Sequence, residues 1–175
     1  MKDVNWNEVP DAGTYPVPGG YIAGITHVED NEQKEYLRIE WEFFDGPYKG
    51  SNQETFERAG FWPYAMICSY KKKALPFFKG FKTSVEMSNR NFIFRNDPQS
   101  LIGKFIGVVL GEEEYLANDG SVKKRLYVAE KRSCKAIKDG DYKVPALKKL
   151  APPSGSAPKT DFAPVLDEDA DLPWA

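Results

Sequence analysis

The stretch Glu35-Tyr36-Leu37-Arg38-Ile39-Glu40-Trp41-Glu42-Phe43-Phe44 decides the fold class of this chain. Apolar residues occupy every second position, and charged residues fill the positions between them. Because successive side chains of a β-strand point to opposite faces, this period of two predicts a strand with one face in a core. The core face holds Leu37, Ile39, Trp41 and Phe43, and the other face holds Arg38, Glu40 and Glu42.

Four more strands are predicted around this one. Residues 20–29 form a first strand, and residues 51–58 alternate weakly as a third, after the turn-rich residues 45–50. Residues 103–115 and 122–130 form two further strands, joined at the turn signal Asn118-Asp119-Gly120.

Helical spacing separates the third strand from the fourth. It runs over residues 63–90 and is interrupted by Pro76, which suits the first turn of a second helix. Asp97-Pro98 marks the start of one further short turn. The fold class expected is therefore mainly β (α+β), with five strands and a helical insertion between the third and fourth. This order is compatible with a small closed or half-closed barrel, and also with another α+β sheet.

The ends of the chain differ from this body in composition. We expect an irregular lead-in over residues 1–19, a domain over residues 20–150, a Pro/Ser/Gly linker over residues 151–166 and an acidic tip over residues 167–175. We expect the acidic C-terminal tail to be disordered and the linker to be flexible, and a linker of this length then gives the tip a reach of about 20–25 Å.

Charge divides the chain in the same way. The last fifteen residues hold five of the 26 acidic groups and no Lys or Arg, whereas all 24 basic residues lie before them. Residues 1–160 therefore carry 24 positive and 21 negative charges, and residues 49–149 alone carry 20 and 11. A basic body joined to an acidic tail points to an interaction protein, although many acidic ends serve solubility only. The apolar hook Leu172-Pro173-Trp174 favours interaction.

Signatures of catalysis are scarce. His27 stands alone in a predicted strand, and Cys68 and Cys134 have no metal-binding spacing. The chain has neither a phosphate-binding glycine loop nor a nucleophile elbow, so we expect no cofactor, no resident metal and no enzyme. A metal-dependent nuclease that uses Glu54, Glu57 and Glu112 is the remaining enzymatic alternative. No apolar run long enough to span a membrane and no signal peptide occur, so a cytoplasmic location is expected.

Cations interleaved with aromatic rings predict binding of single-stranded nucleic acid, because cations follow phosphates and flat rings stack on unpaired bases. In the last strand Lys123, Arg125 and Tyr127 share one face. A second set combines the aromatic pair Trp62 and Tyr64 with the lysine triplet; further phosphate contacts are expected nearby. The triplet is Lys71, Lys72 and Lys73, and the further contacts are Lys49 and Arg58. The alternatives are an ordinary charged outer strand face for the first set and core packing for the aromatics of the second.

The tail Asp167-Glu168-Asp169-Ala170-Asp171-Leu172-Pro173-Trp174 resembles the acidic tip of single-stranded DNA-binding proteins. The body, through Leu75-Pro76-Phe77-Phe78-Lys79-Gly80-Phe81 and Gly107-Val108-Val109-Leu110-Gly111-Glu112-Glu113-Glu114-Tyr115, is similar to phage and prophage single-stranded DNA-binding proteins of Gram-positive bacteria. The resemblance implies an oligonucleotide-binding (OB) barrel that binds single-stranded DNA without regard to sequence. It also implies a tip that recruits phage or host replication and recombination proteins. The partner-binding residues would be Asp167, Glu168, Asp169, Asp171, Leu172, Pro173 and Trp174.

One residue departs from the family pattern. The aromatic residue of the tip is usually last in the family, whereas Ala175 follows Trp174 here, which displaces the terminal carboxylate by one residue. A rival function also stays open: a protein–protein adaptor or host-factor inhibitor that acts through its acidic tail without binding nucleic acid. The sequence leaves homo-oligomerisation open.

Overall fold

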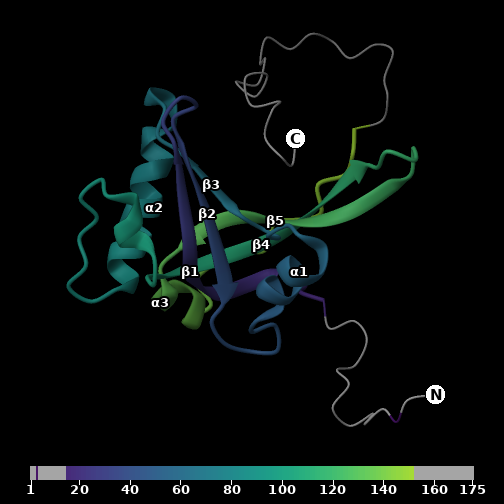
Figure 1. Ribbon diagram of the computed structural model, residues 1–175, viewed down its shortest axis with the longest axis horizontal. Coiled ribbons are helices and arrows are strands. Elements are labelled where there is room, and N and C mark those ends of the chain that lie inside the picture. Colours follow the sequence, from purple (N-terminus) through teal and green to yellow (C-terminus); the bar gives the residue numbers. More distant parts are fainter. Residues whose placement is uncertain (1–2, 4–14, 152–175) are drawn as a thin grey trace.

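A five-stranded antiparallel sheet forms the body of the protein in a computed structural model, which describes residue 3 and residues 15–151 (Figure 1). The strands are β1 (Gly19–Asn31), β2 (Tyr36–Phe43), β3 (Met66–Ser69), β4 (Phe105–Leu116) and β5 (Val122–Arg132). They lie in the order β3-β2-β1-β4-β5, so β1 is central and β3 and β5 are the two edges. Helices accompany the sheet, which makes this an α+β fold.

The helices lie in the connections and after the last strand. They are α1 (Ser51–Ala59), the short turn η1 (Lys72–Ala74), α2 (Leu75–Ser88), the short turn η2 (Pro98–Leu101) and α3 (Cys134–Lys138). Pro76 lies in the first turn of α2, and the side chain of Asp97 accepts the Gln99 amide at the start of η2, as the sequence predicts.

The core lies on the inner face of the sheet and under α2. The predicted apolar face of β2 is fully buried, and buried residues of β1, β3, β4 and α2 extend the core around it. Trp41 and Phe43 meet edge-to-face with ring centroids 4.8 Å apart, which is a favoured aromatic geometry. The strict alternation of this strand therefore predicted its orientation, and its limits to within one residue at each end.

The third strand is where the sequence prediction is wrong. Residues 51–58 belong to helix α1, and the real β3 is the four-residue segment Met66–Ser69, which falls inside the region predicted to be helical. A helix forms at residue 51 because the carboxylate of Glu42, at the end of β2, accepts the backbone N–H groups of Asn52 at 3.2 Å and Gln53 at 2.8 Å. These are donors that the first turn of a helix leaves without intrahelical partners.

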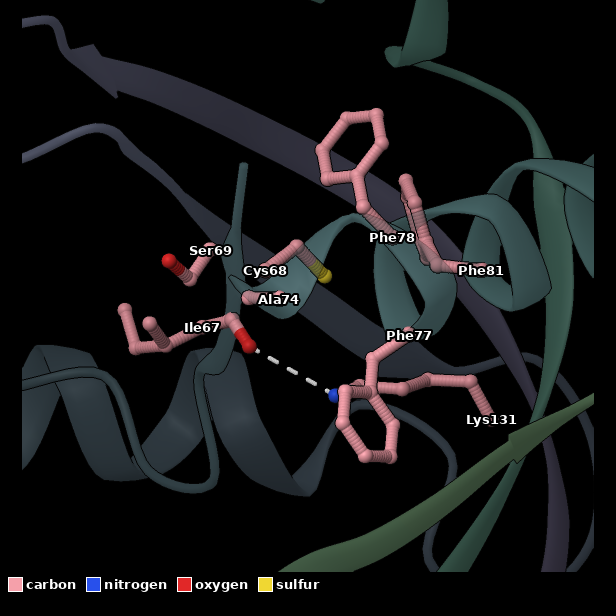
Figure 2. A pocket seen from close by; sticks show the side chains of 8 residues that line it. All are labelled: Ile67, Cys68, Ser69, Ala74, Phe77, Phe78, Phe81 and Lys131. Atoms are coloured by element: carbon pink, nitrogen blue, oxygen red, sulfur yellow. Dashed lines mark hydrogen bonds between the residues drawn. The ribbon is translucent and has the colours of Figure 1, made fainter. Parts of the chain in front are cut away.

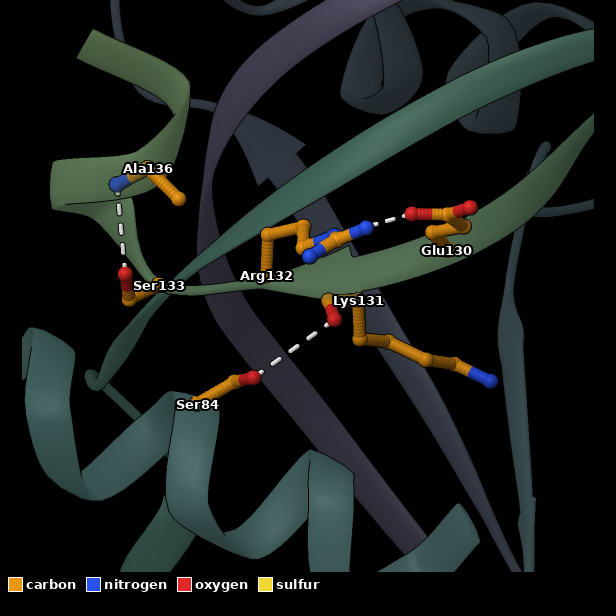
Figure 3. A network of polar contacts seen from close by, with 6 residues as sticks. All are labelled: Ser84, Glu130, Lys131, Arg132, Ser133 and Ala136. Carbon is orange, nitrogen blue, oxygen red and sulfur yellow. Dashed lines mark hydrogen bonds and ion pairs between the residues drawn. The ribbon is translucent and has the colours of Figure 1, made fainter. Parts of the chain in front are cut away.

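The sheet is not closed into a barrel, because β3 and β5 do not pair with each other in the described part of the chain. Helix α2 contacts both edge strands. The hydroxyl of Ser84 lies 3.5 Å from the carbonyl oxygen of Lys131 and so joins α2 to β5 (Figure 3). At the end of β5 the hydroxyl of Ser133 accepts the Ala136 amide and caps α3.

Candidate nucleic-acid interface

Strands β4 and β5 continue beyond the rest of the sheet as a two-stranded arm (Figure 1). The arm ends in the predicted turn, where Gly120 has a φ of 82° and Asp119 accepts the Ser121 amide at 2.9 Å. Hydrogen bonds from the hydroxyl and the amide of Ser121 lower the pKa of the Asp119 carboxyl. The turn fixes the register, in which Tyr115 pairs with Lys123 and Glu113 pairs with Arg125.

One face of the arm carries the predicted residues of β5. Lys123, Arg125 and Tyr127 occupy alternate positions and therefore share a face, as the sequence predicts. Leu126, on the opposite face, packs against the core, whereas Val122 is 56% exposed because the arm extends past the core.

Tyr115 joins this face from β4. The Arg125 guanidinium lies over the Tyr115 ring at 5.1 Å from its centroid, and its Nε donates to the carboxylate of Glu113 at 2.8 Å. At the tip, the Nζ of Lys123 lies 3.8 Å from the carboxylate of Asp119. Tyr115 was not among the predicted site residues, although a turn centred on Asp119 places it directly opposite Lys123.

Lys148 reaches the same face from a distant part of the chain. Its backbone N–H donates to the carbonyl oxygen of Glu112 at 3.0 Å, and its own carbonyl accepts the Glu114 amide at 2.8 Å. The chain can pair here because β1 begins opposite Leu110 and leaves this edge of β4 uncovered. The Lys148 Nζ then lies 4.1 Å from the centroid of the Tyr127 ring. The sequence indicated only that residues 131–150 are basic and wrap the domain.

Trp62 and Tyr64, the two aromatics predicted to contact bases, lie in the loop after α1 and pack around Trp41. The Trp62 indole donates to the carbonyl oxygen of Trp41 at 2.9 Å, and the Trp41 indole donates to the carbonyl oxygen of Tyr64 at 2.7 Å. Both residues are half-buried, and burial raises the pKa of the Tyr64 phenol. Lys49, just before α1, and Arg58, in the last turn of α1, are exposed.

The predicted lysine triplet lies at the other end of β2. Lys71 is half-buried, whereas Lys72 and Lys73 are exposed in η1. The chain before them pairs Ser69 with Tyr36, at the start of β2, whereas α1 follows the end of that strand. The seven steps of β2 between these ends span about 24 Å. The ten predicted residues therefore form three groups rather than one continuous surface: the arm, the surroundings of α1, and η1.

The predicted partner-binding residues all lie outside the described residues, so the structure does not describe them. Within residues 15–151 no three His, Cys, Asp or Glu side chains gather in a way that could hold a metal ion. Glu54 and Glu57 lie on α1 and Glu112 on β4. No helix in the described part of the chain is long and apolar enough to cross a membrane.

In comparisons with known proteins, no protein-family model matches this chain, and no curated protein matches it.

Proposed function

We propose that this protein binds single-stranded DNA without regard to base sequence, in the replication or recombination of a phage or prophage. Its body would be a half-open barrel of the OB type, and its acidic tip would recruit partner proteins. The rival adaptor or inhibitor would use the tip alone.

The strand order supports the OB assignment. An OB barrel consists of five strands in Greek-key order and is often only partly open. Here β1 pairs with both β2 and β4, β3 and β5 are the free edges, and α2 lies between β3 and β4 in the sequence. Closing such a barrel would require β3 to approach β5, and the Nζ of Lys131 already lies 3.5 Å from the carbonyl oxygen of Ile67 across this seam.

The observation that carries the proposal is the alternation of rings and cations on the arm. Tyr115 and Tyr127 each lie beneath a cation, Arg125 and Lys148 respectively, and Lys123 extends the row towards the tip. A single strand needs cations at the spacing of its phosphates and rings on which its bases can stack. Each stacked base contributes about 1–3 kcal/mol regardless of its identity.

Acidic neighbours weaken the binding of phosphates at this face. Glu113 and Asp119 already pair with Arg125 and Lys123, so phosphates must compete with carboxylates. Partly exposed ion pairs of this kind contribute only about 0.2–1 kcal/mol, and a phosphate chain that releases counterions can displace them.

Anisotropy of a labelled oligo-dT strand, titrated at a low and a high salt concentration, tests the proposal. Anisotropy of the labelled strand does not depend on exposed tryptophans, and of the two tryptophans within residues 15–151, Trp41 is fully buried and Trp62 is half-buried. We expect binding that weakens steeply with salt. The double variant Lys123→Glu/Arg125→Glu should bind more weakly. The slope of the logarithm of its binding constant against the logarithm of the salt concentration should be shallower by about 0.7 for each lost phosphate contact.

The matched control carries the same change of charge at Arg90→Glu/Arg95→Glu. Arg90 and Arg95 are exposed and follow the end of α2. Asn89, at that end, accepts the Phe105 amide, and Phe105 begins β4 whereas Tyr115 lies near its other end. This control should bind as the wild type does. A wild-type protein that does not bind oligo-dT at either salt concentration would favour the adaptor.

A further inference from the structure

A cleft of about 200 Å³ lies at the seam between β3 and β5 (Figure 2). Strand β3 contributes Ile67 and Cys68 to its wall, and β5 contributes Lys131. Helix α2 contributes three rings, those of Phe77, Phe78 and Phe81. The cleft exists because the two edge strands do not pair, so α2 and one lysine side chain span the gap between them.

The cleft has an aromatic ring exposed to water at its mouth. Phe78 and Phe81 pack together with ring centroids 5.8 Å apart, and Phe81 is fully buried. Phe77, one helical position before them, is 81% exposed. Covering an exposed ring at the mouth of an apolar cleft with another apolar group removes apolar surface from water and so lowers the free energy.

Three lysines lie in or directly beside the cleft, whereas the carboxylates of Asp30, Glu32 and Glu35 lie around Tyr70, whose ring packs against Phe78. Figure 3 shows the Lys131 side chain leaving β5 away from those of Glu130 and Arg132, which pair with each other at 2.8 Å. Lys72 and Lys73 are exposed in η1, whose last residue, Ala74, lines the cleft. An occupant that suits this site combines an apolar group with several carboxylates.

The chain's own C-terminal tip has this chemistry. Residues 167–171 carry four carboxylates, and Leu172-Pro173-Trp174 follows directly.

The connection to the tip is long enough. The Leu150 amide donates to the Glu114 carboxylate at 3.0 Å, which places the end of the described chain beside Glu114 of β4. At the cleft, Lys131 pairs with Val108, which lies six residues before Glu114 on the same strand. Those six steps correspond to about 20 Å. Residues 152–166 can span up to about 50 Å when extended, so the tip can reach the cleft of its own chain.

We propose that the C-terminal tip docks in the cleft of its own chain, with Trp174 against Phe77 and the carboxylates near Lys72, Lys73 and Lys131. Docking requires no nucleic acid and so does not rest on the proposed function. The cleft is also separate from the arm, because Lys131 and Lys123 are eight residues apart on β5, or about 27 Å.

Fluorine NMR of the full chain labelled with 5-fluorotryptophan tests this docking. The chain has four tryptophans, which should give separate signals, and the variant Trp174→Phe should identify the signal of the tip. We expect the Trp174 signal to differ from that of a synthetic peptide of residues 165–175. It should move to the peptide position in Phe77→Ser and in Lys131→Glu. The signal of the buried Trp41 should stay in place and so show that the fold is intact.

Matched controls decide between the outcomes. Phe61→Ser removes another exposed phenylalanine, 59% accessible, and should leave Trp174 docked. The proposal is wrong if the wild-type Trp174 signal coincides with that of the peptide. It is also wrong if Lys123→Glu/Arg125→Glu releases the tip while Phe77→Ser does not, because the tip would then lie on the arm. Docking that increases with protein concentration would assign the tip to a second copy and contradict docking within one chain.

Discussion

The carboxylate of Glu42 accepts the backbone N–H of Asn52 at 3.2 Å, and so connects the end of β2 to the first turn of α1. Its other oxygen accepts the Gln53 amide, while the side chain of Asn52 donates to the carbonyl oxygen of Trp41 at 2.9 Å. The residue before the helix, Gly50, provides no side-chain cap. A strand residue therefore performs the capping that usually comes from the residue preceding a helix.

Replacing this carboxylate should destabilise the protein. Glu42→Ala leaves the first amides of α1 without their acceptor, and we expect the free energy of unfolding to fall by about 1–2 kcal/mol. Urea unfolding followed by circular dichroism measures the change. Glu57→Ala is the control, since Glu57 only accepts the side chain of Gln53 on the exposed face of α1; equal losses in the two variants would contradict the capping role.

Two glycines of the sheet should differ sharply in their tolerance of a methyl group. A Cβ on Gly107 would lie 2.5 Å from a side-chain carbon of Ile137 and 2.8 Å from the carbonyl oxygen of Ser133. Gly107→Ala should therefore lower the free energy of unfolding by about 1–3 kcal/mol.

Gly24 provides the comparison on the same sheet. A Cβ there meets only the Phe105 ring at 3.7 Å, which is ordinary contact. Gly24→Ala should be neutral or slightly stabilising, because alanine loses less backbone entropy on folding than glycine. Thermal melting of both variants measures the difference, and similar melting temperatures would refute the close packing of α3 on β4.

The ion pair on the arm should oppose binding of single strands. Glu113→Gln removes a carboxylate partner of Arg125 and one negative charge from the face that holds Tyr115 and Tyr127. If this face binds single-stranded DNA, affinity should rise by a factor of roughly 2–5 at low salt, and the gain should shrink at high salt. Oligo-dT anisotropy measures it, with Glu86→Gln on α2 as the charge-matched control. An unchanged affinity would place the binding face elsewhere.

The Tyr70 phenol should lose its proton only at an unusually high pH. Its phenol donates to the Asp30 carboxylate at 2.7 Å. Partial burial, this hydrogen bond and the carboxylates of Asp30, Glu32 and Glu35 raise its pKa to about 12. Above the ordinary value of 10.0 the unfolded chain ionises this phenol while the folded chain keeps its proton. The stabilisation is therefore complete below that pH and is lost as the pH rises towards the folded pKa.

Ultraviolet absorbance of tyrosinate follows this titration directly. Asp30→Asn should shift the high-pH step in absorbance to lower pH, because it removes the carboxylate charge that disfavours ionisation of Tyr70. Tyr70→Phe should abolish the step. A high-pH step that survives in Tyr70→Phe belongs to another tyrosine.

The sequence predicted those parts of the fold that local patterns determine. Strand β2 alternates over eight residues and faces a core on one side only, so its period is unambiguous. Strand β3 has four residues, too few to show a period, and it owes its place to pairing with β2 rather than to its own pattern. Helix α1 was mistaken for a strand because its capping carboxylate lies ten residues before Asn52, at a spacing that no local pattern reveals.

The candidate site was predictable to a similar extent. The shared face of Lys123, Arg125 and Tyr127 follows from alternation alone. The position of Lys148 over Tyr127 depends on an uncovered edge of β4, and the exposure of Phe77 depends on a seam between strands that are distant in sequence. Only the assembled sheet reveals these two features.

The central place of β1 has a consequence for how the chain tolerates change. Four of the five strands form two local hairpins, β1–β2 and β4–β5, which join along the pairing of Gly19–Gly24 with Phe105–Leu110. The 61 residues from 44 to 104 connect the hairpins. Closing a loop costs only about 0.6 kcal/mol more for each doubling of its length. Insertions in the exposed turns of this connection should therefore be nearly neutral, whereas a single added residue within Gly19–Gly24 would shift every later side chain of β1 to the wrong face.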